Sequence, residues 1–160
     1  MKPLVALIIS ILLLILCGCH AIISNRLQYV ESVTLYEQGN PYSIPRNNAA
    51  FTRIVKQTEH IINKPLSSCN CTFLTKEDFI RNTTDGVMIE LEKPIKIKIK
   101  KEENSEVGEA TLNALWISLD PEQKQLATIN EVQPSLFGGN KKCFIDIKKT
   151  ASIYLQKERK

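Results

Sequence analysis

The sequence has few of the residues on which recognisable enzyme sites depend. Only two histidines occur among its 160 residues. No Gly-x-Ser-x-Gly motif, no His-Glu-x-x-His motif and no glycine-rich phosphate loop ahead of a helix is present. Five cysteines are far fewer than a disulfide-dense scaffold contains, and neither an internal repeat nor a low-complexity segment occurs. These absences exclude a repeat protein and a scaffold held mainly by disulfides, and they give no support to an enzyme.

An excess of charge of one sign is also missing. The 21 Lys and Arg residues against 17 Asp and Glu give a net charge of +4, in a chain that is 43% hydrophobic and 24% charged. This composition excludes a disordered charged tail and a polytopic membrane protein. A mildly basic chain without aromatic interleaving or a recognisable module indicates no nucleic-acid partner. We therefore expect one domain that is stabilised mainly by buried apolar surface.

The N-terminal segment is strongly apolar. Residues Leu4 to Ile23 include no Asp, Glu, Lys or Arg, and Ser10 alone interrupts the run from Leu4 to Leu16. With Lys2 ahead of it, this run has the length and charge pattern of a secretory signal peptide. The leader predicts export from the cytoplasm.

A short motif, Leu16-Cys17-Gly18-Cys19, follows the leader. It resembles the lipobox of bacterial lipoproteins, in which a leucine and two small residues precede an obligatory cysteine. Cys17 stands where alanine or serine is commoner. The resemblance implies that Cys19 carries a diacylglyceryl group and that a type II signal peptidase cuts before it. It covers only the leader and the motif, and it implies nothing about the rest of the chain.

These features predict a signal peptide over residues 1–18, a lipidated tether over 19–26 and a single extracytoplasmic domain over 27–160. One alternative is an uncleaved transmembrane helix over residues 4–23. Twenty residues at about 1.5 Å each span a hydrocarbon core of about 30 Å. Ordinary secretion with a cleaved leader is a third possibility.

Three cysteines remain if Cys19 is acylated, namely Cys69, Cys71 and Cys143. An odd number cannot pair completely. A bridge between Cys69 and Cys71 would close a strained ring, so the favoured disulfide joins one of them to Cys143. The functional alternative is a site for a soft metal that is built from all three sulfurs. No histidine adds support for such a site.

The first half of the domain predicts a strand and two helices. Residues 27–37 alternate in part, as expected of a strand. Apolar residues recur at intervals of three and four over 47–63, which predicts the main helix, ending ahead of Pro65. A capping-box-like pattern predicts a short second helix over 76–82.

The second half of the domain is predicted to consist mainly of strands. We expect them over 87–92, 95–100, 110–119, 126–132 and 143–148, with a turn or bend at Glu92-Lys93-Pro94 and a short final element over 152–157. The order of elements predicts an α+β fold, with a mostly antiparallel sheet of about five strands covered on one face by the main helix.

A lysine stripe, Lys96, Lys98 and Lys100, is the most conspicuous feature outside the leader. The stripe could form a basic surface that faces the membrane. The more common case is a solvated strand face, on which lysines discourage pairing with the edge of another sheet. Glu90 and Glu92 share one face of the preceding strand. We expect them to pair with Lys96 or Lys98 across a hairpin rather than to form a carboxylate pair for catalysis.

Taken together, the sequence predicts a lipid-anchored protein on the extracytoplasmic face of the cell membrane. We expect its domain to bind an unidentified protein or small molecule, to catalyse no reaction and to need no cofactor. A single-pass membrane protein with the same domain is the first alternative. A thiol or soft-metal-handling protein using Cys69, Cys71 and Cys143 is the second.

Overall fold

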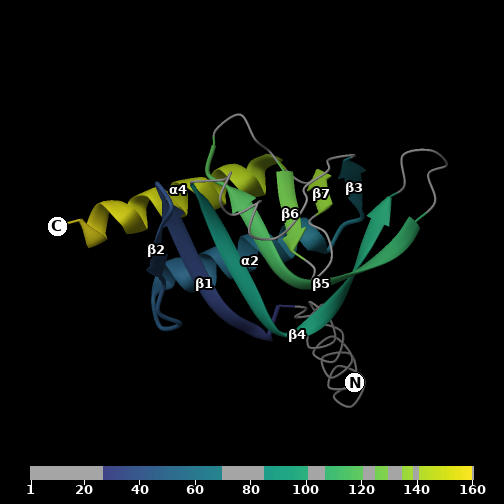
Figure 1. Cartoon of the computed structure of the whole chain (residues 1–160), viewed down its shortest axis with the longest axis horizontal. Coiled ribbons are helices and arrows are strands. Elements are labelled where there is room, and N and C mark those ends of the chain that lie inside the picture. The colour runs from purple at the N-terminus through teal and green to yellow at the C-terminus, as the bar shows by residue number, and fades with distance from the viewer. Residues whose placement is uncertain are drawn as a thin grey trace, which may run out of the picture.

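The computed structural model describes residues 27–69, 85–100, 107–120, 125–129, 135–138 and 141–159. Both helices of this part lie behind a twisted sheet in the view of Figure 1. The elements are β1 (Val30–Glu37), β2 (Asn40–Ser43), α2 (Ala49–Ile62), β3 (Leu66–Cys69), β4 (Gly86–Lys100), β5 (Val107–Ser118), β6 (Gln125–Ile129), β7 (Ser135–Gly138) and α4 (Lys141–Glu158). The α+β class predicted from the sequence is confirmed.

The strands form one sheet in the order β2-β1-β4-β3-β7-β6-β5, and β5 also pairs with β4. This additional pairing closes β4, β5, β6, β7 and β3 into a ring of five strands, and β1 and β2 extend from β4. Every pairing is antiparallel except that of β3 with β4. The prediction of a mostly antiparallel sheet is confirmed.

The long strand β4 belongs to both parts of the sheet. On the edge opposite β5, it pairs first with β1, up to Leu91, and then with β3, at Ile99 and Lys100. On the β5 edge, Glu90 stands opposite Ala114, whereas the next matched residue is Ile95, opposite Leu112. We call residues 86–91 the proximal segment of β4 and residues 95–100 its distal segment.

The two segments are separated by a bend and not by a hairpin turn. Residues 91–94 of β4 face the single residue Asn113 of β5, and such an insertion bends a strand and increases its twist. The sequence predicts strands 87–92 and 95–100 with a turn or bend between them, and the structure has the bend. The parity of the core-facing residues of β5 also changes here, from Leu112 to Leu115.

The helix α2 begins and ends where the sequence predicts. The Asn48 side chain accepts a hydrogen bond of 2.9 Å from the Ala50 amide, which caps the first turn. Asn63 ends the helix two residues before Pro65. The predicted main helix over 47–63 is confirmed. The short helix predicted over 76–82 lies outside the described residues.

The C-terminal region is a helix, and the strand predicted over 143–148 is wrong. Phe144 is fully buried and Ile145 is 57% exposed, which reverses the predicted alternation. Over the longer span of α4, the buried positions recur at intervals of three and four, as in an amphipathic helix. They are Cys143, Phe144, Ile147, Thr150, Ala151, Tyr154 and Leu155. The short final element expected over 152–157 is part of this helix.

One core joins the helices to the sheet. The C-terminal half of α4 reaches the β1–β2 hairpin, where the Tyr154 hydroxyl donates to the Ser43 carbonyl (3.2 Å) and Arg159 forms an ion pair with Glu37. This hydrogen-bonded ion pair lowers the pKa of Glu37. The fully buried members of the core with the largest side chains include Leu35, Ile54, Ile61, Ile62, Leu66, Ile89, Ile97, Leu112, Leu115, Ile117 and Phe144.

The proximal segment is also buried on the face that points away from the helices. Met88 and its cross-strand neighbour Trp116 are 2% and 1% exposed. The Trp116 ring lies 5.2 Å from the Tyr36 ring, centre to centre, and it covers the backbone of Gly86 so closely that a Cβ there would overlap the indole. A glycine at position 86 is therefore required by this packing.

Candidate functional site

The described part of the chain begins beside the bend of β4. The Glu92 amide donates to the Tyr29 carbonyl (2.8 Å), and the Lys93 ammonium nitrogen lies 5.3 Å from the centre of the Tyr29 ring, a cation–π contact. Leu27 is 3% exposed and belongs to the core. The segment that precedes Leu27 therefore joins the domain at this bend.

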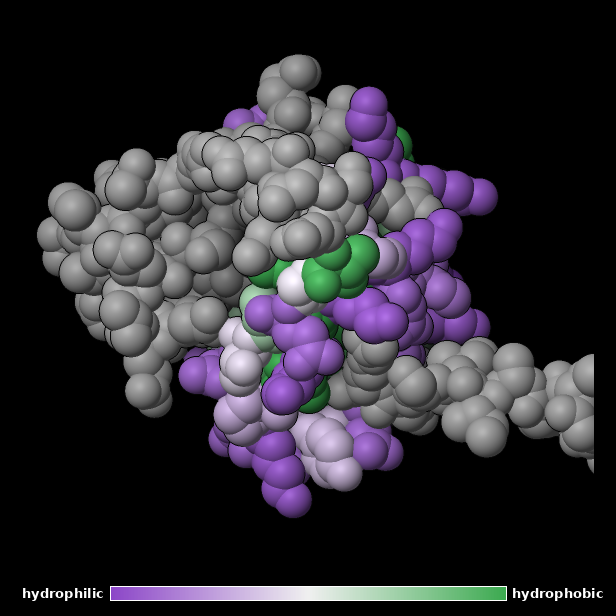
Figure 2. All heavy atoms as spheres, turned by 90° about the vertical axis from the view of Figure 1, so that its right-hand side faces the viewer, coloured by the Kyte–Doolittle hydropathy of each residue, from purple (hydrophilic) through white to green (hydrophobic). Residues whose placement is uncertain are grey.

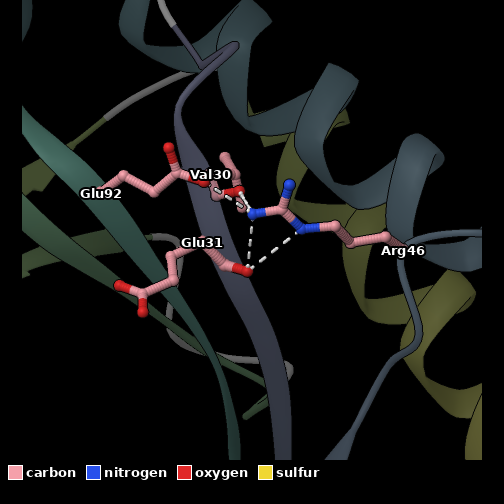
Figure 3. Close-up of polar contacts among 4 residues, drawn as sticks. All are labelled: Val30, Glu31, Arg46 and Glu92. Atoms are coloured by element: carbon pink, nitrogen blue, oxygen red, sulfur yellow. Dashed lines mark hydrogen bonds and ion pairs between the residues drawn. The ribbon is translucent and has the colours of Figure 1, made fainter.

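Arg46 lies in the loop before α2, and its polar contacts stabilise the bend of β4 (Figure 3). Its guanidinium donates to the carbonyls of Val30 (2.8 Å) and Glu31 (3.1 Å), and it forms an ion pair of 2.9 Å with Glu92. The register of β1 against β4 shifts at Glu31, which leaves these carbonyls free to accept from a side chain. Since its Nη2 and Nε donors are used by the protein itself, Arg46 serves the fold.

The predicted lysine stripe lies exposed on the distal segment. Ile97 is 1% exposed, whereas Lys96, Lys98 and Lys100 on either side of it are exposed, so the period of two read from the sequence is confirmed. Lys96 reaches Glu109 of β5 at 3.3 Å, but both side chains are more than 60% exposed, so this ion pair adds little stability. Lys98 and Lys100 have no ion pair within the described residues.

The surface around the lysines is hydrophilic but not entirely so. Val107, the cross-strand neighbour of Lys100, is 56% exposed. Figure 2 views the molecule from the right-hand side of Figure 1, where the distal segment ends, and shows hydrophilic residues around a small hydrophobic patch. A basic surface with an exposed apolar residue can meet a charged partner and bury some apolar area as well.

The two glutamates of β4 have separate partners. Glu90 accepts a hydrogen bond of 2.7 Å from the Ser32 hydroxyl, and Glu92 binds Arg46. The expected pairing of these glutamates with Lys96 or Lys98 across a hairpin is wrong, because both segments belong to one continuous strand. The acidic partner of Lys96 comes from β5 instead. Each carboxylate is engaged locally, and we find no paired-carboxylate site here.

The predicted cysteine site falls largely outside the described part of the chain. The backbone of Cys69 ends β3, but its side chain, all of Cys71 and the predicted lipidation residue Cys19 lie outside the described residues. Cys143 is a buried thiol on α4 that has no disulfide partner among the described residues, and its burial, together with the nearby Asp146 carboxylate, raises the pKa of the thiol. A raised pKa disfavours the thiolate, the form that reacts and binds metals. The disulfide and the soft-metal site remain predictions.

Neither a metal cluster nor a membrane span is found among the described residues. No group of three or more His, Cys, Asp or Glu side chains within these ranges is placed to hold a metal ion. Neither α2 nor α4 combines the length and apolar composition that a bilayer-spanning helix needs.

A groove of about 190 Å³ lies between the start of α2 and the second half of α4. Charged residues from both helices line it, namely Arg53, Lys157 and Glu158, together with Thr150 and Ile153. Burial and the nearby Glu158 carboxylate raise the pKa of Tyr154, which also borders the groove. Because ligand pockets usually enclose at least about 300 Å³, this groove suits a side chain of a partner better than a separate small molecule.

The sequence reasoning found the lysine stripe but missed the contacts that organise the bend. Arg46 and Tyr29 carry no recognisable motif, and their partners lie about 15 to 60 positions away in the chain. The only sequence signal for the bend of β4 is Pro94 together with a break in the alternation of apolar and polar residues.

Comparisons of the chain with protein-family models, with curated proteins and with solved structures gave no match.

Proposed function

We propose that this chain is a lipid-anchored protein of the extracytoplasmic face of the cell membrane, and that its α+β domain binds a partner and catalyses no reaction. The observation that carries the proposal is Leu16-Cys17-Gly18-Cys19 at the end of an uncharged leader. Each buried methylene of an attached acyl chain contributes about 0.8 kcal/mol, so the two chains of a diacylglyceryl group suffice to hold a protein on a bilayer.

The polar groups of the domain support binding rather than catalysis. The side chains that first suggest chemistry, Glu90, Glu92 and Cys143, are hydrogen-bonded, paired or buried. By contrast, the groove between α2 and α4 and the lysine-bearing face of β4 leave charged groups accessible. These two surfaces are the sites at which we expect recognition.

The anchor is tested by metabolic labelling with a fatty acid, followed by mass spectrometry of the purified chain. The wild type should incorporate the label and begin at Cys19 with the added lipid mass. Cys19→Ser should remain unlabelled, whereas Cys17→Ser, the matched control, should be labelled as the wild type is. A chain that keeps residues 1–18 and carries no lipid would instead support the single-pass alternative with residues 4–23 in the membrane.

The binding role is tested on the membrane-bound protein by photo-crosslinking. Ile153 lines the groove, and Ile145 on the same helix is exposed but does not line it. A photoreactive residue at position 153 should give a discrete adduct that position 145 does not give. The same adducts from both positions, or none from either, would argue against recognition at the groove.

A further inference from the structure

The tether is short in comparison with the domain it holds. Eight residue steps separate Cys19 from Leu27, and an extended chain covers at most about 3.5 Å per residue, or about 28 Å in all. This reach is similar to the diameter of a small domain. The domain therefore cannot rotate freely at a distance, and the surface around Leu27 is the one that meets the membrane most often.

The lysine-bearing segment starts at that same surface. Tyr29 contacts both Glu92 and Lys93 at the bend of β4, two residues after Leu27. Along a strand that rises about 3.3 Å per residue, Lys96 to Lys100 lie roughly 10 to 23 Å beyond Lys93. All these lysines are exposed, so the whole row is within reach of a surface that the anchor occupies.

The lysine-bearing segment itself carries a net positive charge, which complements an anionic surface. Lys96, Lys98 and Lys100 stand opposite Thr111, Glu109 and Val107 of β5, so Glu109 is the one acid among their described cross-strand partners. Glu92, which precedes them on the same side of β4, is paired with Arg46. The sequence between the two strands, 101–106, adds Lys101 and three glutamates. Because electrostatic attraction fades within a Debye length of about 8 to 10 Å, the strand lysines act only when they lie directly on the headgroups.

We propose that Lys96, Lys98 and Lys100 dock on the anionic headgroups of the membrane that holds the anchor, and that they fix the orientation of the domain. This inference rests on the proposed function, since it takes Cys19 as the point of attachment. Val107, exposed beside Lys100, adds an apolar contact at the same surface. In this orientation the distal segment faces the bilayer.

The experiment uses the full chain, purified from membranes and reconstituted into vesicles of zwitterionic lipid alone or with 30% anionic lipid. A brief pulse of an amine-acetylating reagent is followed by peptide mass mapping, which also reports the lipid mass on Cys19. Each lysine near an anionic surface favours the docked state about fivefold, so three together favour it on the order of 100-fold. We expect the three stripe lysines to be protected several-fold in anionic vesicles and not in zwitterionic ones, with the protection lost in 0.5 M salt.

Two triple variants give the matched comparison. Lys96→Gln/Lys98→Gln/Lys100→Gln removes the row, and the protection of Lys93 beside it should fall to the level seen in zwitterionic vesicles. Lys56→Gln/Lys141→Gln/Lys149→Gln removes the same charge from exposed positions of α2 and α4 that do not line the groove, and the protection of the row should persist.

The experiment distinguishes failure of the docking proposal from failure of the proposed anchor at Cys19. Lipid on Cys19 with equal acetylation of the row in both vesicle types would overturn the docking and leave the anchor intact. Absence of lipid from Cys19 would overturn the proposed function, whatever the acetylation shows. Protection that is equal for the lysines of the row and those of the helices would mean general adsorption, and it would also overturn the docking proposal.

Discussion

The two segments of β4 have opposite environments although they belong to one strand. The proximal segment is buried on both faces, by the helices below Val87 and Ile89 and by Trp116 above Gly86 and Met88. The distal segment is buried only on the face of Ile97, and its other face carries lysines. A strand covered on one face tolerates any solvated residue on the other, whereas a strand covered on both faces is restricted at every position.

This contrast separates two roles along the strand. In the proximal segment nearly every side chain contributes to stability, so substitutions there should unfold the protein. In the distal segment the outward residues are free to be selected for interaction. Substitutions matched across the bend should therefore differ in what they damage.

The largest expected effect is that of Gly86→Ala. The added Cβ would overlap the Trp116 indole, which is 1% exposed and has no room to withdraw. Overpacking of this kind costs about 3 kcal/mol. Urea titration read by proteolysis should show the loss, and Trp116→Leu in the same chain should restore part of it, as coupled neighbours do. A cost below about 1 kcal/mol would mean that the proximal segment is not tightly packed on both faces.

The next comparison uses the same substitution on either side of the bend, and the expected difference between the two variants is about 2 kcal/mol. Ile89→Ala removes a fully buried side chain and should cost about 3 kcal/mol, whereas Ile99→Ala removes a half-buried one and should cost about 1 kcal/mol. The same urea titration measures both. Equal losses would contradict the difference in packing between the segments.

Arg46→Met tests the junction of the two segments. The substitution keeps the aliphatic stem but removes the donors to Val30 and Glu31 and the ion pair with Glu92. Because the paired side chains are 59% and 47% exposed, most of the effect comes from the carbonyl hydrogen bonds, at about 1 kcal/mol in total. Hydrogen exchange at the Glu92 amide should accelerate more than exchange in the middle of β5, and uniform acceleration would place the effect elsewhere.

The smallest effect on stability is expected for Lys98→Thr. The side chain is exposed and has no ion pair within the described residues, so the change should stay within about 0.5 kcal/mol. The same urea titration measures this change. Because β4 is paired with β5 from Ile95 to Lys100 and with β3 at Ile99 and Lys100, the row does not lie at an outer edge of the sheet. A loss above about 1 kcal/mol would show that Lys98 makes a contact that contributes to the fold.

Local patterns predicted the elements that have a single buried face. The main helix and the distal segment each show one clean period, the first strand alternates in part, and the structure confirms each of them. α4 was misread because Cys143, Ile145 and Ile147 satisfy a period of two over six residues, which is too short a window to reveal spacings of three and four. Phe144, which is fully buried although it has the opposite parity to Cys143 and Ile147, is the signal that contradicts a strand.

Features that depend on residues far apart in the sequence could not be predicted from local patterns. β3 and β7 have four residues each, too few to show a period, and they exist as strands because they pair with each other. The change of parity at Asn113 follows from an insertion in a different strand. Of the candidate site, exposure of the lysines could be predicted, but the contact between Tyr29 and Lys93, at the start of the lysine-bearing segment, depends on the fold.

Closure of the five-stranded ring sets an order on how the chain can fold as it is made. Ser67 of β3 pairs with Lys100, 33 positions later, and with Gly138, 71 positions later. A nascent chain must therefore be synthesised past Gly138 before β3 has both neighbours, and contacts of such long range make folding slow. Until then the unpaired edges of the incomplete sheet are accessible to other chains, so we expect the ring to close only once the residues through Gly138 are available.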